Sequence, residues 1–237
     1  MGKNLKKIAL EIIKGAKTDK EKAEKIWNFV KEEIKYKVTI LADPKKILKE
    51  KYGSCIDKTI LFVFLLRALG IKGRYHIILF DIKSALKKVK EENPEVFKKF
   101  SFSSLFLKNS FLEKVPPLPH SYPEAFVGRK WVKFDRSFLD KDLEKKIKRG
   151  RLLGKEVAKT DLGAFDKISD VLKREEIKRV IVLGKKRPKI ASMILNKINS
   201  YLFFLRDIKD KKLAKKENIS EMIDRIIKLS KTNGKRF

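Results

Sequence analysis

The chain has 237 residues, enough to bury a substantial core, and a hydrophobic content of 43% with 10% aromatic residues indicates a folded protein. Its single cysteine, Cys55, excludes an intramolecular disulfide and a cysteine-based zinc site, and fits a reducing, cytoplasmic location. A formal net charge of +30 invites anionic partners, but lysines spread along the whole chain also fit the lysine-rich surface of a thermophilic protein.

The first part of the chain predicts helices. Residues 1–15 form an amphipathic pattern without the long apolar run of a signal peptide, and no apolar run reaches membrane-spanning length. Residues 19–34 carry an apolar stripe in which we expect Trp27 to be a core residue. Residues 36–41 favour a strand, and Asp43 followed by proline opens a further short helix.

The next stretch predicts the central helix. Apolar residues recur at intervals of three and four over residues 55–69, after Gly53. Cys55 begins this helix, where the positive end of the helix dipole and unpaired N–H groups favour a thiolate. The alternative is that Cys55 is an inert core residue, as most lone cysteines are. Residues 74–80 then read as a strand.

A long connection, residues 81–118, is rich in phenylalanine and proline and predicts a packed insertion that covers a cleft as a lid. Residues 120–127 and 130–134 follow as two strands of a hairpin. Pro123 in the first of these strands indicates an edge position or a bulge.

Beyond Asp140 the chain is rich in lysine and mainly helical in pattern. The expected helices span residues 166–177, 188–206 and 220–229, and residues 179–183 predict a short strand. We therefore expect a core in residues 1–140 and a helical extension in residues 141–237.

Two histidines are available to assist a cysteine nucleophile. A thiol that attacks a carbonyl needs a base that later protonates the leaving group, and a third group usually orients that base. His120 starts one strand of the predicted hairpin and Asp135 follows the other, so the two can meet side by side. Glu124, four residues after His120, shares its face by strand alternation.

This ordered set resembles the transglutaminase-like superfamily of papain-type thiol enzymes. The resemblance rests on residues 52–76 (YGSCIDKTILFVFLLRALGIKGRYH) and 120–140 (HSYPEAFVGRKWVKFDRSFLD), and covers roughly residues 20–140. It implies an α+β fold with a papain/transglutaminase-like core, in which a helix packs on an antiparallel sheet. It also implies that Cys55 is the nucleophile, His120 the base and acid, and Asp135 the orienting carboxylate.

Other residues are weaker candidates. Tyr36 is the nearest equivalent of the family's aromatic residue that helps to form the oxyanion site, and Glu124 is either a partner of the site or an ordinary strand carboxylate. His76 is the rival base and Asp57 the rival acid, although the helix dipole alone explains Asp57. Trp131 is expected in the strand core.

The sequence therefore predicts a cytoplasmic thiol enzyme that acts on amide bonds of a protein or peptide substrate through a thioester. A cysteine peptidase or amidase is the default, and a transglutaminase is the variant in which a lysine amine replaces water. No metal or cofactor is expected. The alternative is a non-catalytic module that holds nucleic acid or a protein through its basic surface, and non-specific attraction to polyanions is expected in either case.

Overall fold

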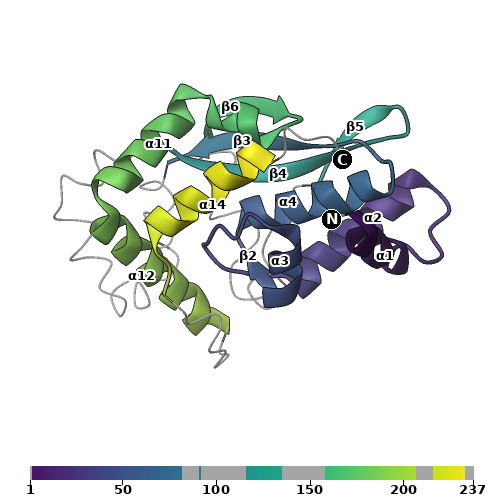
Figure 1. The fold of residues 1–237 in the computed structure, drawn as a ribbon, viewed down its shortest axis with the longest axis horizontal. Helices are drawn as coiled ribbons and strands as arrows, with labels where there is room; N and C mark the ends of the chain where they lie inside the picture. Colours follow the sequence, from purple (N-terminus) through teal and green to yellow (C-terminus); the bar gives the residue numbers. More distant parts are fainter. Residues whose placement is uncertain (1, 82–90, 92–115, 135–157, 207–215, 233–237) are drawn as a thin grey trace.

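The computed structural model describes residues 2–81, 91, 116–134, 158–206 and 216–232 (Figure 1). The elements in these ranges, in chain order, are α1 (Gly2–Ile12), α2 (Asp19–Glu33), β1 (Lys35–Tyr36), α3 (Pro44–Glu50), β2 (Tyr52–Gly53), α4 (Cys55–Ala68), β3 (Gly73–Phe80), β4 (Leu118–Val127), β5 (Lys130–Lys133), β6 (Ala158–Phe165), α10 (Ile168–Leu172), α11 (Glu175–Lys186), α12 (Pro188–Arg206) and α14 (Ile219–Thr232).

The central element is α4, which is buried on all sides. Eleven of its residues are buried, and the apolar run from Ile60 to Leu66 makes contact with α1, α2 and the sheet. Phe62 joins Trp27 of α2 edge to face at 5.7 Å between ring centroids, and Phe134 lies 5.0 Å from Phe62. The expected core role of Trp27 is confirmed, because only 7% of this residue is exposed.

The main sheet described here is antiparallel, in the order β5-β4-β3-β6. One of its faces packs on α4, since a Cβ placed on Gly73 would meet Leu66 and Val63. The α+β class is confirmed: a helix packs on an antiparallel sheet, and the described C-terminal part is mainly helical, with α10, α11, α12 and α14 (Figure 1).

The hairpin between β4 and β5 turns at Gly128 and Arg129, as the sequence predicts. Both residues have positive φ, 59° and 61°, which matches the type I′ turn that the right-handed twist of a two-strand ribbon favours.

The expected edge or bulge at Pro123 is wrong. β4 lies between β3 and β5, and its register with β3 runs without a shift from Ala125 to Leu118. A proline is tolerated here because its backbone nitrogen, which has no hydrogen to donate, faces residue 134. This residue lies one position past the end of β5, where the strand pairing has already ended. The Phe134 N–H donates to the Pro123 carbonyl at 3.0 Å, so only one bond of this pair is lost.

Two other strand predictions need correction. Residues 179–183 lie within α11, where the apolar run is flanked by Glu175 at the start and Lys186 at the end, charges that suit a helix dipole. Residues 36–41 form a strand only at β1, which pairs in parallel with β2. The segment that follows β1 instead bonds to side chains from distant parts of the chain.

β6 is the strand that the sequence pattern did not reveal. It pairs with β3 from Tyr75 opposite Phe165 to Phe80 opposite Ala158, with register shifts on the way. The C-terminal part of the chain therefore supplies one edge of the sheet that supports α4.

Candidate active site

Cys55 occupies the first turn of α4, and the local sequence explains why the helix begins there. The side chain of Ser54 caps the helix by accepting from the N–H of Asp57, while the Asp57 carboxylate accepts from the Ser54 N–H at 3.1 Å. This reciprocal capping fixes the start of the helix. The residue Cys55 is 8% exposed, so its thiol sits at the positive end of the helix dipole in a nearly buried position.

Gly53 is required by a close approach of backbone to Asp57. A Cβ at this position would lie 2.6 Å from the Cβ of Asp57, a distance that side chains do not adopt. The glycine two residues before Cys55 is thus explained by packing beneath the capping carboxylate.

Asp57 is fully buried, and its carboxylate is occupied by backbone groups. One oxygen accepts from the N–H groups of Leu41 and Ala42 at 2.9 and 3.0 Å, and the other accepts from Ser54. Burial raises the pKa of Asp57 to about 6, in spite of the backbone hydrogen bonds that lower it. These contacts give Asp57 a structural explanation, because the carboxylate links the backbone at residues 41–42 to the first turn of α4.

His120 lies in β4, is 3% exposed and stands opposite Ile78 of β3. Gly73 of β3 is a common reference point for the positions of Cys55 and His120. It lies beside Val63 of α4 and pairs with Ala125 of β4. Cys55 precedes Val63 by about 12 Å of helix, and His120 precedes Ala125 by about 17 Å of strand. Both residues therefore lie toward the same end of the fold, the end at which α4 and β4 begin (Figure 1).

Strand alternation decides the face from which His120 projects. Gly73 and its partner Ala125 face α4, so His120 and Glu124 project from the opposite face of the sheet. A meeting of Cys55 with His120 would therefore take place at the end of the sheet, beyond the body of α4.

His76 and Glu124 form an ion-pair cluster on the face that carries His120. His76 Nδ1 is 2.7 Å from Glu124, and His76 Nε2 is 2.7 Å from Asp161 of β6. Arg74 donates to the second oxygen of Glu124 at 2.7 Å. Each ring nitrogen of His76 therefore faces a carboxylate oxygen, so the imidazole is held from both sides.

Asp161 lies at the exposed end of this cluster. Burial raises its pKa, but hydrogen bonds from the Gly163 N–H and from His76 outweigh burial and leave the pKa below its ordinary value. Tyr122 stacks on the His76 ring at 4.5 Å and lies 6.4 Å from the His120 ring. These contacts occupy His76 and Glu124 with each other and with their neighbours, which argues against His76 as a base.

The remaining candidates have different outcomes. Tyr36 lies in β1 opposite Gly53, two residues before Cys55, which places its backbone beside the start of α4. Trp131 is half-buried, and the Arg74 guanidinium lies 3.9 Å from the centre of its ring. The expected position of Trp131 in the core is therefore wrong. The aromatic residue of this hairpin that packs in the core is Phe134, against Phe62. Asp135 and most of the expected lid, residues 81–118, lie outside the described residues.

The sequence missed Asp161 because β6 carries no clear strand pattern and pairs with β3 through shifted register. The contact between Arg74 and Glu124 could have been found in the sequence, since both residues lie in predicted strands of alternating pattern.

No described group of three or more histidine, cysteine, aspartate or glutamate side chains is arranged to hold a metal ion. No described helix is both long and apolar enough to cross a membrane.

Comparison with known proteins gives one family match. The sequence profile described as Transglutaminase-like superfamily matches residues 6–136. No curated protein matches the chain.

Among solved structures, a candidate cysteine protease from Cytophaga hutchinsonii is 18% identical, with a TM-score of 0.44 over 71% of this chain and 44% of that one. A candidate protease from Parabacteroides distasonis ATCC 8503 is 14% identical, with a TM-score of 0.38 over 58% of this chain and 24% of that one. The chain thus spans less than half the length of either structure.

Proposed function

The chain belongs to the transglutaminase-like superfamily, and from that premise we propose that it is a cysteine hydrolase acting on amide bonds through Cys55, His120 and Asp135. The observation that carries the proposal is the position of Cys55, the single cysteine of the chain, in the first turn of a buried, capped helix. This helix begins toward the same end of the fold as β4, the strand that carries His120 near its start (Figure 1). Asp135 enters through the resemblance alone.

In the proposed reaction the Cys55 thiolate attacks the amide carbonyl and forms a tetrahedral intermediate. N–H groups in the first turn of α4 have no partner within the helix, so the backbone N–H of Cys55 can donate to the oxyanion. His120, protonated in the resting ion pair, gives its proton to the leaving amine, and a thioester remains. His120 then takes a proton from water, which attacks the thioester and releases the acid.

Hydrolysis is the default because water is always available. Transamidation follows the same path, with a lysine amine in place of water, and a test with both acceptors separates the two. The substrate class that fits this chemistry is a protein or peptide carrying a carboxamide or peptide bond.

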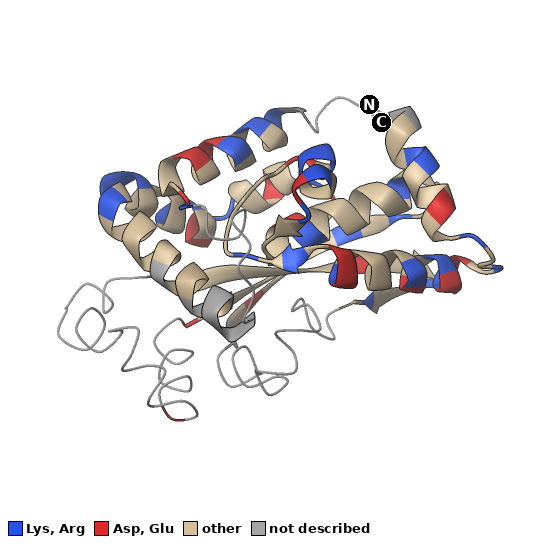
Figure 2. Cartoon of the chain, turned by 90° about the horizontal axis from the view of Figure 1, so that it is seen from below, with Lys and Arg blue, Asp and Glu red and all other residues tan. Residues whose placement is uncertain are grey.

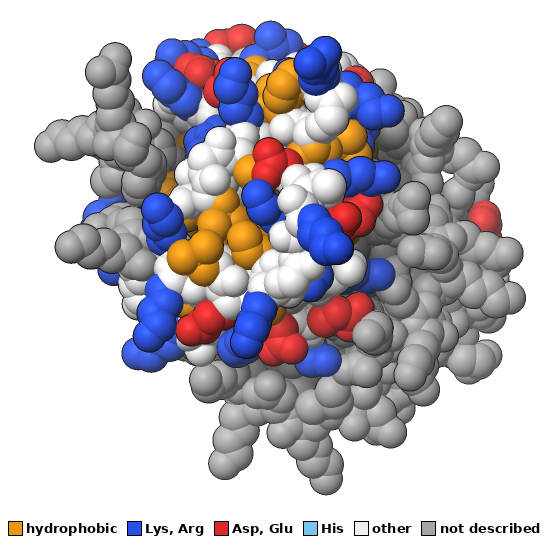
Figure 3. All heavy atoms as spheres, turned by 90° about the vertical axis from the view of Figure 1, so that its right-hand side faces the viewer, with side chains coloured by type: hydrophobic (Ala, Val, Ile, Leu, Met, Phe, Trp, Pro, Cys, Tyr) orange, Lys and Arg blue, Asp and Glu red, His pale blue; other side chains and the backbone are white. Residues whose placement is uncertain are grey.

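The alternative of a non-catalytic binding module rests on the net charge of +30 and on the lysine-rich residues 141–237, which lie beyond the family match. Figure 2 shows lysine and arginine on all parts of the described chain, and Figure 3 shows them interspersed with acidic and apolar side chains on one face. Such a spread favours weak, salt-sensitive attraction to polyanions. A salt series with single- and double-stranded nucleic acid tests it, and binding that persists above physiological ionic strength would favour the alternative.

The thiol enzyme is tested by alkylation of the full chain with iodoacetamide at pH 6. We expect Cys55 to react at least about tenfold faster than glutathione, because the proposed pairing with His120 at a helix N-terminus favours the nucleophilic thiolate. His120→Ala should abolish the fast reaction. His76→Asn is the matched control, since it changes the other histidine of the chain and should leave the reaction fast.

Alkylation of Cys55 no faster than that of glutathione would end the proposal. Loss of fast labelling in His76→Asn together with retention in His120→Ala would transfer the role of base to His76.

A further inference from the structure

We propose that the C-terminal helices position the nucleophile, and that Asn199 of α12 and Glu217 before α14 are positioning residues for Cys55. They act through residues 37–42, here called the bridging segment, which lies between these helices and the start of α4. The inference rests on the proposed function, because it assigns a role in the reactivity of Cys55.

Asn199 binds the bridging segment as a neighbouring strand would. Its side-chain oxygen accepts from the N–H of Val38 at 2.8 Å, and its side-chain nitrogen donates to the Val38 carbonyl at 2.9 Å. An extended residue presents both backbone groups to the same side, and a planar amide matches the pair. Asn199 is 7% exposed, so loss of the amide would leave these groups poorly hydrated.

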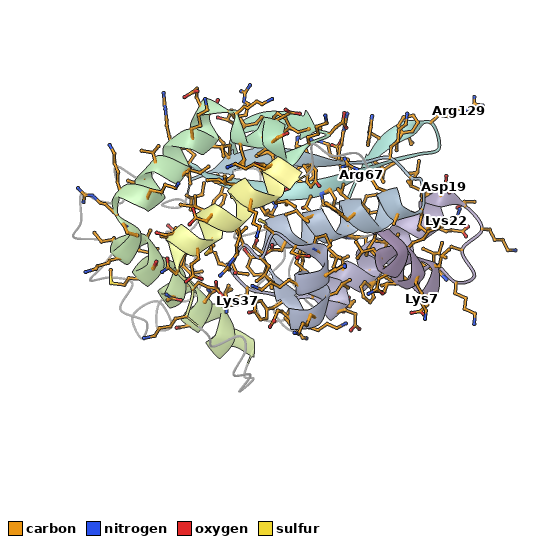
Figure 4. The ribbon with its side chains drawn as sticks, viewed as in Figure 1. Lys7, Asp19, Lys22, Lys37, Arg67 and Arg129 are labelled. Atoms are coloured by element: carbon orange, nitrogen blue, oxygen red, sulfur yellow. The ribbon has the colours of Figure 1, made fainter. Side chains whose placement is uncertain are left out.

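Glu217 holds the residues on either side of Val38. One oxygen lies 2.7 Å from the Lys37 ammonium, and the other accepts from the Thr39 hydroxyl at 3.0 Å. The side chains of Lys37 and Glu217 are 2% and 6% exposed. Figure 4 shows Lys37 on the side of the core that faces α12 and α14.

Ile40 completes this edge of the bridging segment. Its carbonyl accepts from Arg225 of α14 at 3.2 Å. Four consecutive residues, 37 to 40, are therefore each bound by the C-terminal part of the chain.

The other edge of the bridging segment is bonded to the residues around Cys55. The N–H of Lys37 donates to the carbonyl of Gly53, two residues before Cys55, at 3.0 Å. Leu41 and Ala42 donate to Asp57, two residues after Cys55.

The backbone conformation of Ala42 fixes the position of this second edge relative to Asp57. Ala42 has φ of 56°, a left-handed conformation that L residues adopt at a cost, and its bond to Asp57 holds it there. A shift of the bridging segment would thus move the groups that cap α4 and orient the thiol.

Asn196 supplies a chemical match for Asn199 on the same helix. It makes the same pair of bonds, accepting from the Glu217 N–H at 2.7 Å and donating to the Glu217 carbonyl at 3.0 Å. These bonds stay within the C-terminal part, so Asn196→Leu removes a half-buried amide that reaches the bridging segment only indirectly, through Glu217.

The experiment compares Asn199→Leu, Asn199→Asp and Asn196→Leu in the full chain by two readouts. These are the thermal unfolding midpoint and the rate of Cys55 alkylation by iodoacetamide between pH 5 and 9, at a temperature where each variant is folded. We expect both leucine variants to lower the midpoint. Asn199→Leu should slow alkylation at pH 6 about tenfold or more and move its pH profile upward, because small displacements at a reactive group have large kinetic effects.

Asn199→Asp keeps the acceptor for Val38 and should give an intermediate effect. Asn196→Leu acts on the bridging segment only through Glu217, so it should slow alkylation clearly less than Asn199→Leu does.

Equal alkylation profiles for Asn199→Leu and the natural chain would overturn the inference, and so would equal slowing by Asn199→Leu and Asn196→Leu. If Cys55 of the natural chain itself reacts no faster than glutathione, the proposed function fails first. A fast natural chain with an unaffected Asn199→Leu variant refutes the positioning role alone.

Discussion

Replacing Asp57 by asparagine should change how the stability of the protein depends on pH. Asp57 is fully buried, and burial raises its pKa from an ordinary value of 3.8 to about 6. The folded protein therefore binds the proton of this carboxyl more tightly than the unfolded chain does. The resulting stabilisation is complete below about pH 4, is lost progressively between pH 4 and 6, and is absent above pH 6.

The size of the effect follows from the shift. A difference of about two pKa units corresponds to about 3 kcal/mol of free energy of unfolding. Asparagine cannot ionise, so Asp57→Asn lacks this contribution at every pH. Relative to Asp57→Asn, the natural protein should lose about 3 kcal/mol between pH 4 and 7, whatever constant offset the altered hydrogen bonds add.

Urea unfolding at half-unit intervals from pH 4 to 7.5 measures this difference. General repulsion in a chain of net charge +30 affects both proteins alike and cancels in the comparison. Asp224→Asn, an exposed residue of α14, controls for the change in net charge. Parallel profiles for the natural protein and Asp57→Asn, or a natural protein that gains on its variant as pH rises, would refute the reasoning.

Three other changes test contacts and turns elsewhere in the fold. Glu217→Gln should lower the free energy of unfolding, measured in urea, by about 3–5 kcal/mol, because it leaves the buried Lys37 ammonium without this carboxylate. Adding Lys37→Met to the same chain should recover most of this loss. Arg129→Gly should stabilise by about 0.5–1 kcal/mol in the same assay, since Arg129 has a φ of 61° that glycine adopts freely. Asp161→Asn should speed hydrogen exchange in β6 more than in β4, because it removes the carboxylate that ties β6 to His76; equal rates in both strands would contradict this role.

The parts of the fold that the sequence predicted are those with strong local signals. The central helix follows from an apolar period sustained over four turns, and the hairpin follows from glycine between two alternating runs. Residues 179–183 misled because a short apolar run fits a strand or one side of a helix, and only the flanking charges favour the helix.

The contacts that could not be predicted are those between distant segments. Asn199 meets Val38 across 161 residues, and Asp161 meets His76 across 85. An asparagine in a helix and an aspartate in a weak strand have many ordinary explanations, so neither residue stands out in the sequence. Pro123 was misjudged for a related reason, because its tolerance depends on where a different strand ends.

These long-range contacts bear on how the chain is divided. The family match ends at residue 136, and the sequence places a boundary near residue 140. The sheet nevertheless continues across this boundary, because β6 covers the edge of β3 that would otherwise leave its backbone groups unpaired. The bridging segment is likewise bonded to α4 on one edge and to α12 and α14 on the other. The family-like part holds the proposed catalytic residues, while the later part completes the sheet and the surroundings of Cys55, so the proposed reactivity of the thiol depends on both parts.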